Sequence, residues 1–235
     1  MADGNLFLRH LRAPDLDILK PELRRADLVV GQEITEQGAE VRMAVLPINC
    51  IISVITVMRD GRAVESRTIG RESGFGLLHA LGSPYAVERV EVQVSGEAWI
   101  LPLPSLSHLA VASPAALKTM TQFAQSTLVQ SSIALACNAL HDVESRLCRW
   151  LLMTQDRLES DILPLTQEHL SIMLAVQRTT INAVAQRLQD TGAIRYSRGR
   201  IQVLDRAMLL RRSCECFEQI EQSAHRLIAS EPVLA

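Results

Sequence analysis

The chain has 235 residues and a formal net charge of −2 at pH 7; 48% of it is hydrophobic and 21% is charged. This length suits about two domains with hydrophobic cores, and the composition excludes a disordered chain. Aromatic residues make up only 3%, which excludes a broad stacking surface for single-stranded nucleic acid. No apolar run reaches the roughly 18 residues that a membrane-spanning helix needs.

The cysteines are odd in number and form no regular framework, a pattern typical of a reducing compartment. Cys214 and Cys216 do not have a zinc-ligand spacing, and no matching pair is evident elsewhere in the sequence. We therefore expect no metal site and interpret the cysteines as small buried hydrophobic residues. Residues 1–15 lack the long apolar segment of a signal peptide, so a cytoplasmic protein is expected. The five cysteines are Cys50, Cys137, Cys148, Cys214 and Cys216.

The first hundred residues change from a helical to a strand pattern. Residues 5–25 favour one or two short helices punctuated by Pro14 and Pro21. Residues 28–103 contain short β-branched runs divided by Gly, Pro or Asn, with one helical interruption near residues 76–81. Asp60-Gly61 between two such runs predicts a hairpin. Many short strands at this spacing predict a β-sandwich or jelly roll.

A long helix is predicted to begin at Ser113-Pro114, because proline is favoured at the first helical position. About 25 residues follow without Gly or Pro, and Lys118 is their only charge. A helix that is apolar nearly all round must be covered on several sides. We expect the strands on one side and a second copy of the chain on another; the alternative is an internal helix of a monomer. The expected dimer seam is Leu117, Met120, Ala124, Leu128, Ser131 and Leu135.

The C-terminal part predicts helix, turn, helix and hairpin. After a hinge at residues 138–142, Asp142 caps a helix, and Thr166 caps the next one. Residues 175–177 form the turn, and the second helix ends at Gly192. Two short strands flank the Arg198-Gly199 turn, and residues 206–228 are expected to form one final helix. Its packing positions are Leu209, Leu210, Cys214, Phe217 and Ile220.

Charge is concentrated in this region. Residues 178–212 contain eight arginines and two aspartates, a local charge of 8 − 2 = +6, so the remainder carries −2 − 6 = −8. A basic patch on an otherwise acidic chain is the electrostatic signature of a protein that binds a polyanion. The alternative is an amphipathic helix pair with a solvated basic face.

Helix, turn, helix and basic hairpin together form a winged helix-turn-helix, whose second helix reads base edges in the DNA major groove. On its outer face we expect Arg178 to match the acceptors of guanine, with Thr179, Asn182 and Ala183 beside it. Phosphate contacts are expected from the hairpin arginines Arg195, Arg198 and Arg200.

Residues 164–206 resemble the DNA-binding domain of Crp/Fnr-type bacterial transcription regulators, and the likeness weakens before about residue 142. By this resemblance Arg178 is the base-reading arginine, and phosphates are contacted by Thr166, Gln167, Gln177 and Thr180. The sequence also departs from the family. Ala175 replaces a turn glycine, Gln177 replaces a capping serine, and Thr179 replaces a glutamate that reads cytosine. The target DNA sequence therefore need not be the family's best-known one.

The strand region resembles the family's cyclic-nucleotide-binding-like β-roll. The family pocket uses Gly-Glu for the ribose and an arginine for the cyclic phosphate, whereas this chain has Leu77 after Gly76 and Glu88 at the arginine position. Arg89 would point to the opposite strand face. We therefore expect no gating by cyclic AMP. The sequence has no cysteine before Cys50, so an N-terminal cysteine cluster for an iron–sulfur centre is not expected. His79 is the candidate axial ligand of a haem, although a lone histidine is more often a hydrogen-bonded or surface residue. A small apolar effector, or no effector, stays open.

These features predict an α+β fold with three parts: a β-roll sensor (1–112), a dimerisation helix and hinge (113–141), and a winged helix-turn-helix domain (142–235). The expected function is that of a homodimeric, sequence-specific DNA-binding transcription regulator, with RNA polymerase as a candidate partner. The alternative is an effector-sensing or protein-interaction module with a degenerate helix-turn-helix. No nucleophile elbow, phosphate loop, metal pair or triad is evident, so no enzyme is expected. No cofactor is identified.

Overall fold

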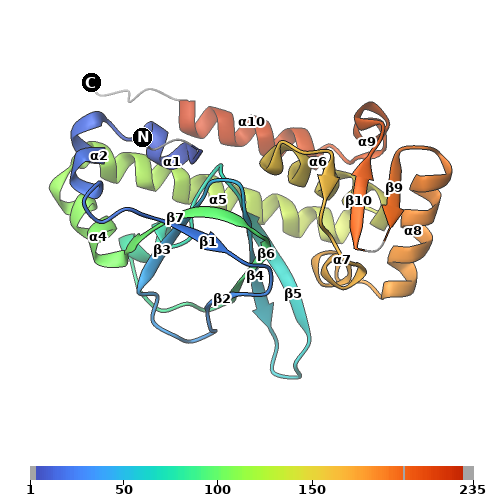
Figure 1. The fold of residues 1–235 in the computed structure, drawn as a ribbon, viewed down its shortest axis with the longest axis horizontal. Coiled ribbons are helices and arrows are strands. Elements are labelled where there is room, and N and C mark those ends of the chain that lie inside the picture. Colours follow the sequence, from blue (N-terminus) through green and yellow to red (C-terminus); the bar gives the residue numbers. More distant parts are fainter. Residues whose placement is uncertain (1–3, 198, 230–235) are drawn as a thin grey trace.

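The structure is a computed structural model that describes residues 4–197 and 199–229. A β-roll lies below the long helix α5, which spans Pro114–Leu140, and the C-terminal helix α10, Cys216–Ala229, lies above it (Figure 1). The helix-turn-helix and its hairpin form one end of the molecule. Within the described ranges, no helix is both long and apolar enough to cross a membrane.

The β-roll contains two antiparallel sheets among the described residues, which confirms the predicted jelly-roll pattern. One has the order β1-β7-β3 and the other β2-β6-β4-β5. The Asp60-Gly61 turn joins β4 to β5 as predicted, with Gly61 at φ +84°, which glycine adopts without a steric penalty. The strands are β1 Arg24–Leu28, β2 Glu33–Thr35, β3 Met43–Pro47, β4 Ile51–Val57, β5 Ala63–Ile69, β6 Arg89–Val94 and β7 Gly96–Pro102.

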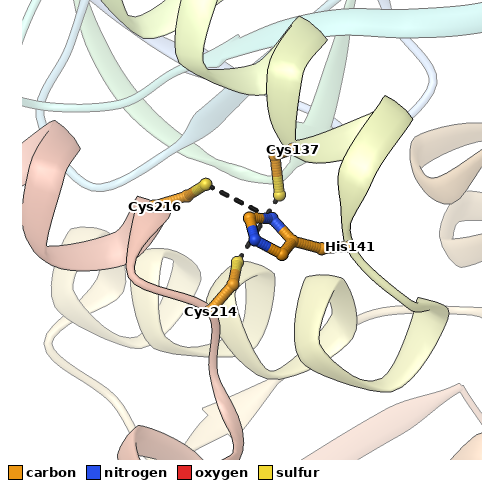
Figure 2. Close-up of side chains that lie close together, drawn as sticks. All are labelled: Cys137, His141, Cys214 and Cys216. Atoms are coloured by element: carbon orange, nitrogen blue, oxygen red, sulfur yellow. Dashed lines mark hydrogen bonds between the residues drawn. The ribbon is translucent and has the colours of Figure 1, made fainter.

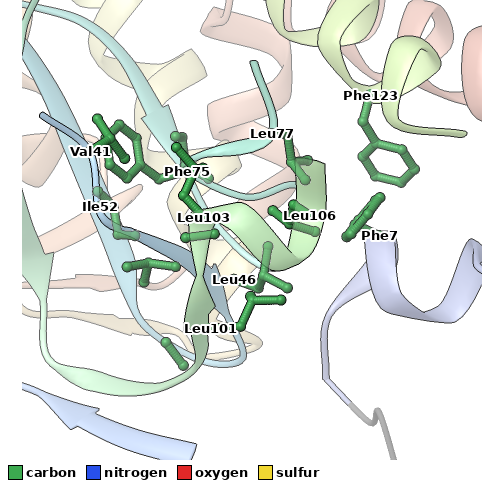
Figure 3. Packing of buried hydrophobic residues seen from close by; sticks show 14 of the residues in the cluster. Phe7, Val41, Leu46, Ile52, Phe75, Leu77, Leu101, Leu103, Leu106 and Phe123 are labelled. Carbon is green, nitrogen blue, oxygen red and sulfur yellow. The ribbon is translucent and has the colours of Figure 1, made fainter. Parts of the chain in front are cut away.

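Short helices close the roll and complete its core. Figure 3 shows Leu103 and Leu106 packed with Leu46 and Leu101 of the strands. Phe7 meets Phe123 of α5 edge-on, with 5.4 Å between ring centroids, so α5 is part of this core. The helices are α1 Leu6–His10, α2 Ala13–Leu19, α3 Leu77–Leu81 and α4 Leu103–Ala112; the sequence patterns did not predict α4.

Helix α5 begins where Ser113 accepts a hydrogen bond from the backbone N–H of Ala116, as the sequence predicts. One expected seam residue lies elsewhere: Met120 is fully buried in the core of its own chain, so it cannot face a second copy. Leu117, Leu128 and Leu135 are 41%, 66% and 74% exposed. Ala124 and Ser131 are half-buried beside them. The helix therefore keeps one largely apolar face open to solvent.

A second hydrophobic core surrounds α6, Val143–Leu158, which Asp142 caps by accepting from the N–H of Ser145. Its members come from the helix-turn-helix, the hairpin sheet and the two C-terminal helices. At the far end of α6, buried Arg157 donates to Thr68 of the roll and pairs with Glu72 at 2.6 Å. These contacts fix α6 against the roll.

The prediction of a single C-terminal helix is wrong. Helix α9 spans Arg206–Arg212, Ser213 is extended at φ −70° and ψ 152°, and α10 starts only at Cys216. The helical spacing of apolar residues continues across the break, which is why the sequence pattern did not show it. The break turns α10 back along α5, toward the N-terminal helices (Figure 1).

A buried carboxyl group lies where the roll meets α6. Glu65 on β5 is 6% exposed and accepts hydrogen bonds from Ser53 and, at 2.8 Å, from Gln93. Burial raises the pKa of Glu65 to about 8, although Ser53, Arg157, Gln93 and Arg149 oppose the shift. The protonated form is therefore favoured at neutral pH in the folded chain.

This shift predicts a pH-dependent stability. Between the ordinary glutamate pKa of 4.5 and the folded value of about 8, the folded chain holds a proton that the unfolded chain has released, so stability falls as pH rises. Glu65→Gln removes this loss. Relative to the native chain, the variant should gain up to about 1.4 kcal/mol per pH unit across this window, measured by urea unfolding at pH 5, 6, 7 and 8.

The matched control is Glu36→Gln, since Glu36 lies exposed in the loop after β2. Its difference from the native chain should stay constant with pH. A constant difference for Glu65→Gln as well would contradict the raised pKa.

Candidate nucleic-acid interface

The helix-turn-helix consists of α7, Gln167–Leu174, and α8, Arg178–Asp190. As predicted, Thr166 caps α7 by accepting from the N–H of His169. Gly192 follows α8 at φ +78°. Both helices are held by apolar side chains that are at most 3% exposed: Leu170, Met173, Leu174, Ile181, Val184 and Leu188.

The turn between the helices shows the effect of the two departures from the family pattern. Ala175 has φ +52°, a left-handed conformation that costs an L-residue about 1–2 kcal/mol relative to the right-handed one. Gln177 occupies the cap of α8 but makes no capping hydrogen bond with its side chain. The turn nevertheless has the geometry that the sequence predicts, because the buried face of α8 holds it.

The outer face of α8 is exposed where base reading was predicted. Arg178, Thr179, Asn182 and Ala183 are all exposed and lie within its first two turns. Asn182 is four residues after Arg178, so both lie on one side of the helix. This side carries a cation and short polar groups suited to the edges of bases.

Arg178 has an acidic neighbour within its own chain. Its guanidinium lies 3.1 Å from the carboxylate of Glu168 on α7, and the two side chains are 59% and 63% exposed. An exposed pair of this kind contributes only about 0.2–1 kcal/mol, whereas a bidentate arginine–guanine contact gives about 1–3 kcal/mol of discrimination. The pair is therefore too weak to keep Arg178 from a base.

The wing is a sheet of order β8-β10-β9 in the described residues, with β8 Ile162–Leu163, β9 Ile194–Ser197 and β10 Arg200–Val203. The sequence predicted β9 and β10 but not β8. Alternation buries Ile194, Ile201 and Val203 and exposes Arg195 and Arg200. Arg198 lies outside the described residues.

The wing is tied to the last turn of α8. The amide N–H of Tyr196 on β9 donates to the side chain of Gln189 at 2.8 Å. Burial raises the pKa of the Tyr196 hydroxyl, although Gln167 opposes the shift. The remaining predicted phosphate contacts, Thr166, Gln177 and Thr180, lie near the starts of α7 and α8; the first two are exposed and Thr180 is half-buried. Helix N-termini favour anions, so the positions suit phosphates.

Charge counting did not show that three arginines of this region have acidic partners on α6. Glu144 of α6 pairs with Arg187 at 3.1 Å and with Arg212 at 2.6 Å. Arg206 pairs with Asp156, also on α6, at 2.9 Å. These three arginines fasten the recognition helix and α9 to α6. Local sequence could not show this, because the acidic partners lie some 40 to 70 residues earlier.

Residues 145–212 match the family of Crp-like helix-turn-helix domains. The fold of most of the chain is similar to that of several solved structures. FixK2 from Bradyrhizobium japonicum has 14% identity and a TM-score of 0.71, covering 82% of this chain and 98% of its own. A crp/fnr-family transcriptional regulator from Eubacterium rectale has 16% identity and a TM-score of 0.67, covering 88% and 97%.

The c-di-GMP-responsive global regulator CLP from Xanthomonas campestris has 15% identity and a TM-score of 0.67, covering 83% of this chain and all of its own. No curated protein matches the sequence. At these identities the solved structures show a shared fold. The chain therefore joins a Crp-like helix-turn-helix domain to the fold of Crp/Fnr transcription regulators.

Proposed function

We propose that this chain, a Crp-like helix-turn-helix domain on a Crp/Fnr regulator fold, is a sequence-specific DNA-binding transcription regulator that acts as a homodimer. The observation that carries the proposal is the exposed outer face of α8, with Arg178 at its N-terminal end and its inner face locked in a core. A helix in this arrangement can enter a major groove without any loss of packing.

Within this proposal the residues divide into two roles. Arg178, Thr179, Asn182 and Ala183 read base edges. The phosphates of the DNA backbone are contacted by polar and cationic groups at the starts of α7 and α8 and on the wing. These residues are Thr166, Gln167, Gln177, Thr180, Arg195, Arg198 and Arg200. The first group gives specificity, and the second gives affinity that falls with salt.

Homodimerisation is supported by the open face of α5. Leu117, Leu128 and Leu135 follow one another at intervals of eleven and seven residues, so they form one stripe along the helix. Ala124 and Ser131 lie between them and allow close approach. With α10 and the roll already packed on other sides of α5, a second α5 is the partner we assign to this stripe. A two-fold dimer also matches palindromic half-sites.

Gating by cyclic AMP is not part of the proposal. Glu88, at the position of the family's phosphate-binding arginine, pairs with Arg67 at 2.9 Å, and the side chains are 18% and 11% exposed. A cyclic phosphate would have to compete with this carboxylate for Arg67, and Leu77 offers no acceptor for a ribose hydroxyl.

We assign residues 1–112 to sensing, 113–141 to dimerisation and the hinge, and 142–235 to DNA binding, without a catalytic activity. Two of the similar solved proteins described above are named as regulators. The cysteines among the described residues are free, which suits the bacterial cytoplasm. Contact with RNA polymerase stays a prediction.

The test is quantitative DNA binding with fragments recovered by genome-wide mapping of bound sites. Arg178→Ala should lose about 1–3 kcal/mol on the preferred site and relax discrimination at one base pair. Arg200→Ala should instead weaken binding to all sequences about equally and reduce the salt slope by about 1, because a phosphate contact carries no sequence information. Fluorescence anisotropy over a range of salt concentrations separates the two effects.

In the same assay, added cyclic AMP should leave the affinity unchanged. Salt-sensitive binding that is equally weak for every sequence would reject sequence-specific regulation. No DNA affinity together with recovery of a protein partner would favour the alternative, an interaction module with a degenerate helix-turn-helix.

Glu168→Gln should raise DNA affinity. The change removes the carboxylate that competes for Arg178 and repels phosphates, so the gain should lie between about 1.4-fold and 5-fold, equivalent to about 0.2–1 kcal/mol. Glu218→Gln, exposed on α10, is the matched control and should change nothing. Weaker binding by Glu168→Gln would mean that the carboxylate positions Arg178 productively.

Leu128→Glu should convert the dimer to a monomer and abolish high-affinity DNA binding, because each α5–α5 contact would bury two unpaired carboxylates. Sedimentation velocity should then change from the mass of two 26.0 kDa chains to that of one. The control is Val111→Glu, since Val111 is 87% exposed on α4 and outside the stripe. A Leu128→Glu chain that stays dimeric would reject this face as the dimer interface.

A further inference from the structure

Four side chains with metal-binding atoms meet where the end of α5 lies beside the start of the C-terminal helix α10. Cys137 and His141 come from the end of α5, and Cys214 and Cys216 come from the break before α10 (Figure 2). Their ligand atoms all lie within 4.8 Å of one another. The three cysteines are buried and His141 is half-buried. The sequence analysis did not recognise Cys137 and His141 as partners of Cys214 and Cys216, because the contacting residues lie 77 and 75 residues apart in the chain.

Two of the distances between ligand atoms are close to those of a tetrahedral metal site. The sulfur atoms of Cys137 and Cys214 are 3.5 Å apart, and the Cys216 sulfur is 3.6 Å from Nδ1 of His141. With metal–sulfur bonds of about 2.3 Å and metal–nitrogen bonds of about 2.0–2.1 Å, tetrahedral geometry puts sulfurs about 3.8 Å apart and sulfur about 3.6 Å from nitrogen. A disulfide would need sulfurs at about 2.0 Å.

The histidine is oriented as a metal ligand requires. Its Nδ1 points to the cysteine sulfurs, while Nε2 lies 3.3 Å from a carboxylate oxygen of Glu215. A metal-bound histidine commonly donates its other ring N–H to a carboxylate, which fixes the tautomer and strengthens the ligand. Glu215 stands between the two cysteine ligands in sequence, so the same short segment supplies both groups.

The surroundings also compensate the charge of such a site. A divalent ion with three thiolates and a neutral imidazole carries 2 − 3 = −1. Arg149 of α6 acts electrostatically on both Cys137 and Cys216. It is 5% exposed, and its Nε has no hydrogen-bond partner among the described residues. The positive charge of this buried guanidinium would offset the negative charge of the site.

We propose that Cys137, His141, Cys214 and Cys216 bind one Zn²⁺ in a closed tetrahedral site that fastens the end of α5 to the start of α10. Zinc is chosen because three thiolates and one imidazole form a typical structural zinc set, and four protein ligands leave no open position for substrate. Binding releases the thiol protons as the cysteines become thiolates.

The proposed site gives a physical reason for the helix break. A continuous helix from 206 to 228 could not place residues 214 and 216 on the same side, because they would differ by about 200° around the axis. The extended residue Ser213 ends α9, and Cys214 and Cys216 then both face α5 (Figure 2). Cys137 lies in the last turn of α5, and the backbone N–H of the C-cap residue His141 donates to the Cys137 carbonyl at 3.1 Å, so the two lie one turn apart.

The first experiment measures metal in the full chain purified under anaerobic, reducing conditions. Inductively coupled plasma mass spectrometry should find one zinc ion per chain. Cys214→Ser should lose it, and Cys50→Ser should keep it, because Cys50 is equally buried but lies in the β-roll core. Replacement of zinc by Co²⁺ should give the intense visible bands of tetrahedral cobalt with a thiolate charge-transfer band, and one equivalent of zinc should bleach them.

A second variant tests the site without replacing a buried cysteine, so its result does not depend on whether a cysteine variant folds. Glu215 is exposed, and Glu215→Gln should lower zinc affinity about 10–100-fold in competition with a chromophoric chelator. Glu218→Gln, one turn further along the same segment, should leave the affinity unchanged. Hydrogen exchange at the end of α5 and the start of α10 should increase when the chelator removes zinc.

Several outcomes would overturn the proposal. They are a reduced chain that binds no zinc at micromolar concentration, a Cys214→Ser chain that keeps one zinc, and a cobalt spectrum with the weak bands of octahedral coordination. A Cys137–Cys214 disulfide in the zinc-free chain purified under reducing conditions would also reject it, in favour of a redox pair. None of these outcomes bears on DNA binding by α8.

Discussion

The candidate interface depends on the burial of one face of α8. Ile181, Val184 and Leu188 are at most 2% exposed, and each contributes about 1.5–3 kcal/mol relative to an exposed side chain. This packing holds the helix through a turn that carries Ala175 in a left-handed conformation and lacks a capping side chain. Since the inner face fixes the helix, the outer face is not needed for packing, and Arg178 on it can enter a DNA groove.

Helix α5 connects the parts of the molecule because it is too apolar to stand alone. Phe123 and Met120 belong to the core of the β-roll, α10 packs along another side, and Cys137 and His141 reach the break before α10. The roll, α10 and the proposed metal ligands of the C-terminal segment therefore all lie against this one helix. The proposed zinc ion lies at that connection.

The arginines of the C-terminal region serve two purposes that net charge cannot separate. Arg187, Arg206 and Arg212 neutralise acidic groups of α6 and fasten the domain. Arg178, Arg195 and Arg200 are exposed on the outer face of α8 and on the wing. Long-range electrostatic attraction depends on the whole set, whereas the proposed direct contacts with DNA involve the second group.

The sequence by itself determined the local features. Capping at Ser113, Asp142 and Thr166, the hairpin at Asp60-Gly61 and the buried spacing of α8 depend on residues within about one or two turns, so pattern and propensity suffice. Contacts between distant segments were decided only by the tertiary structure. Met120 is buried because the roll covers it, and Glu144 pairs with two arginines. The break at Ser213 places Cys214 and Cys216 beside Cys137 and His141. Such pairings depend on how whole elements pack, and no local spacing records them.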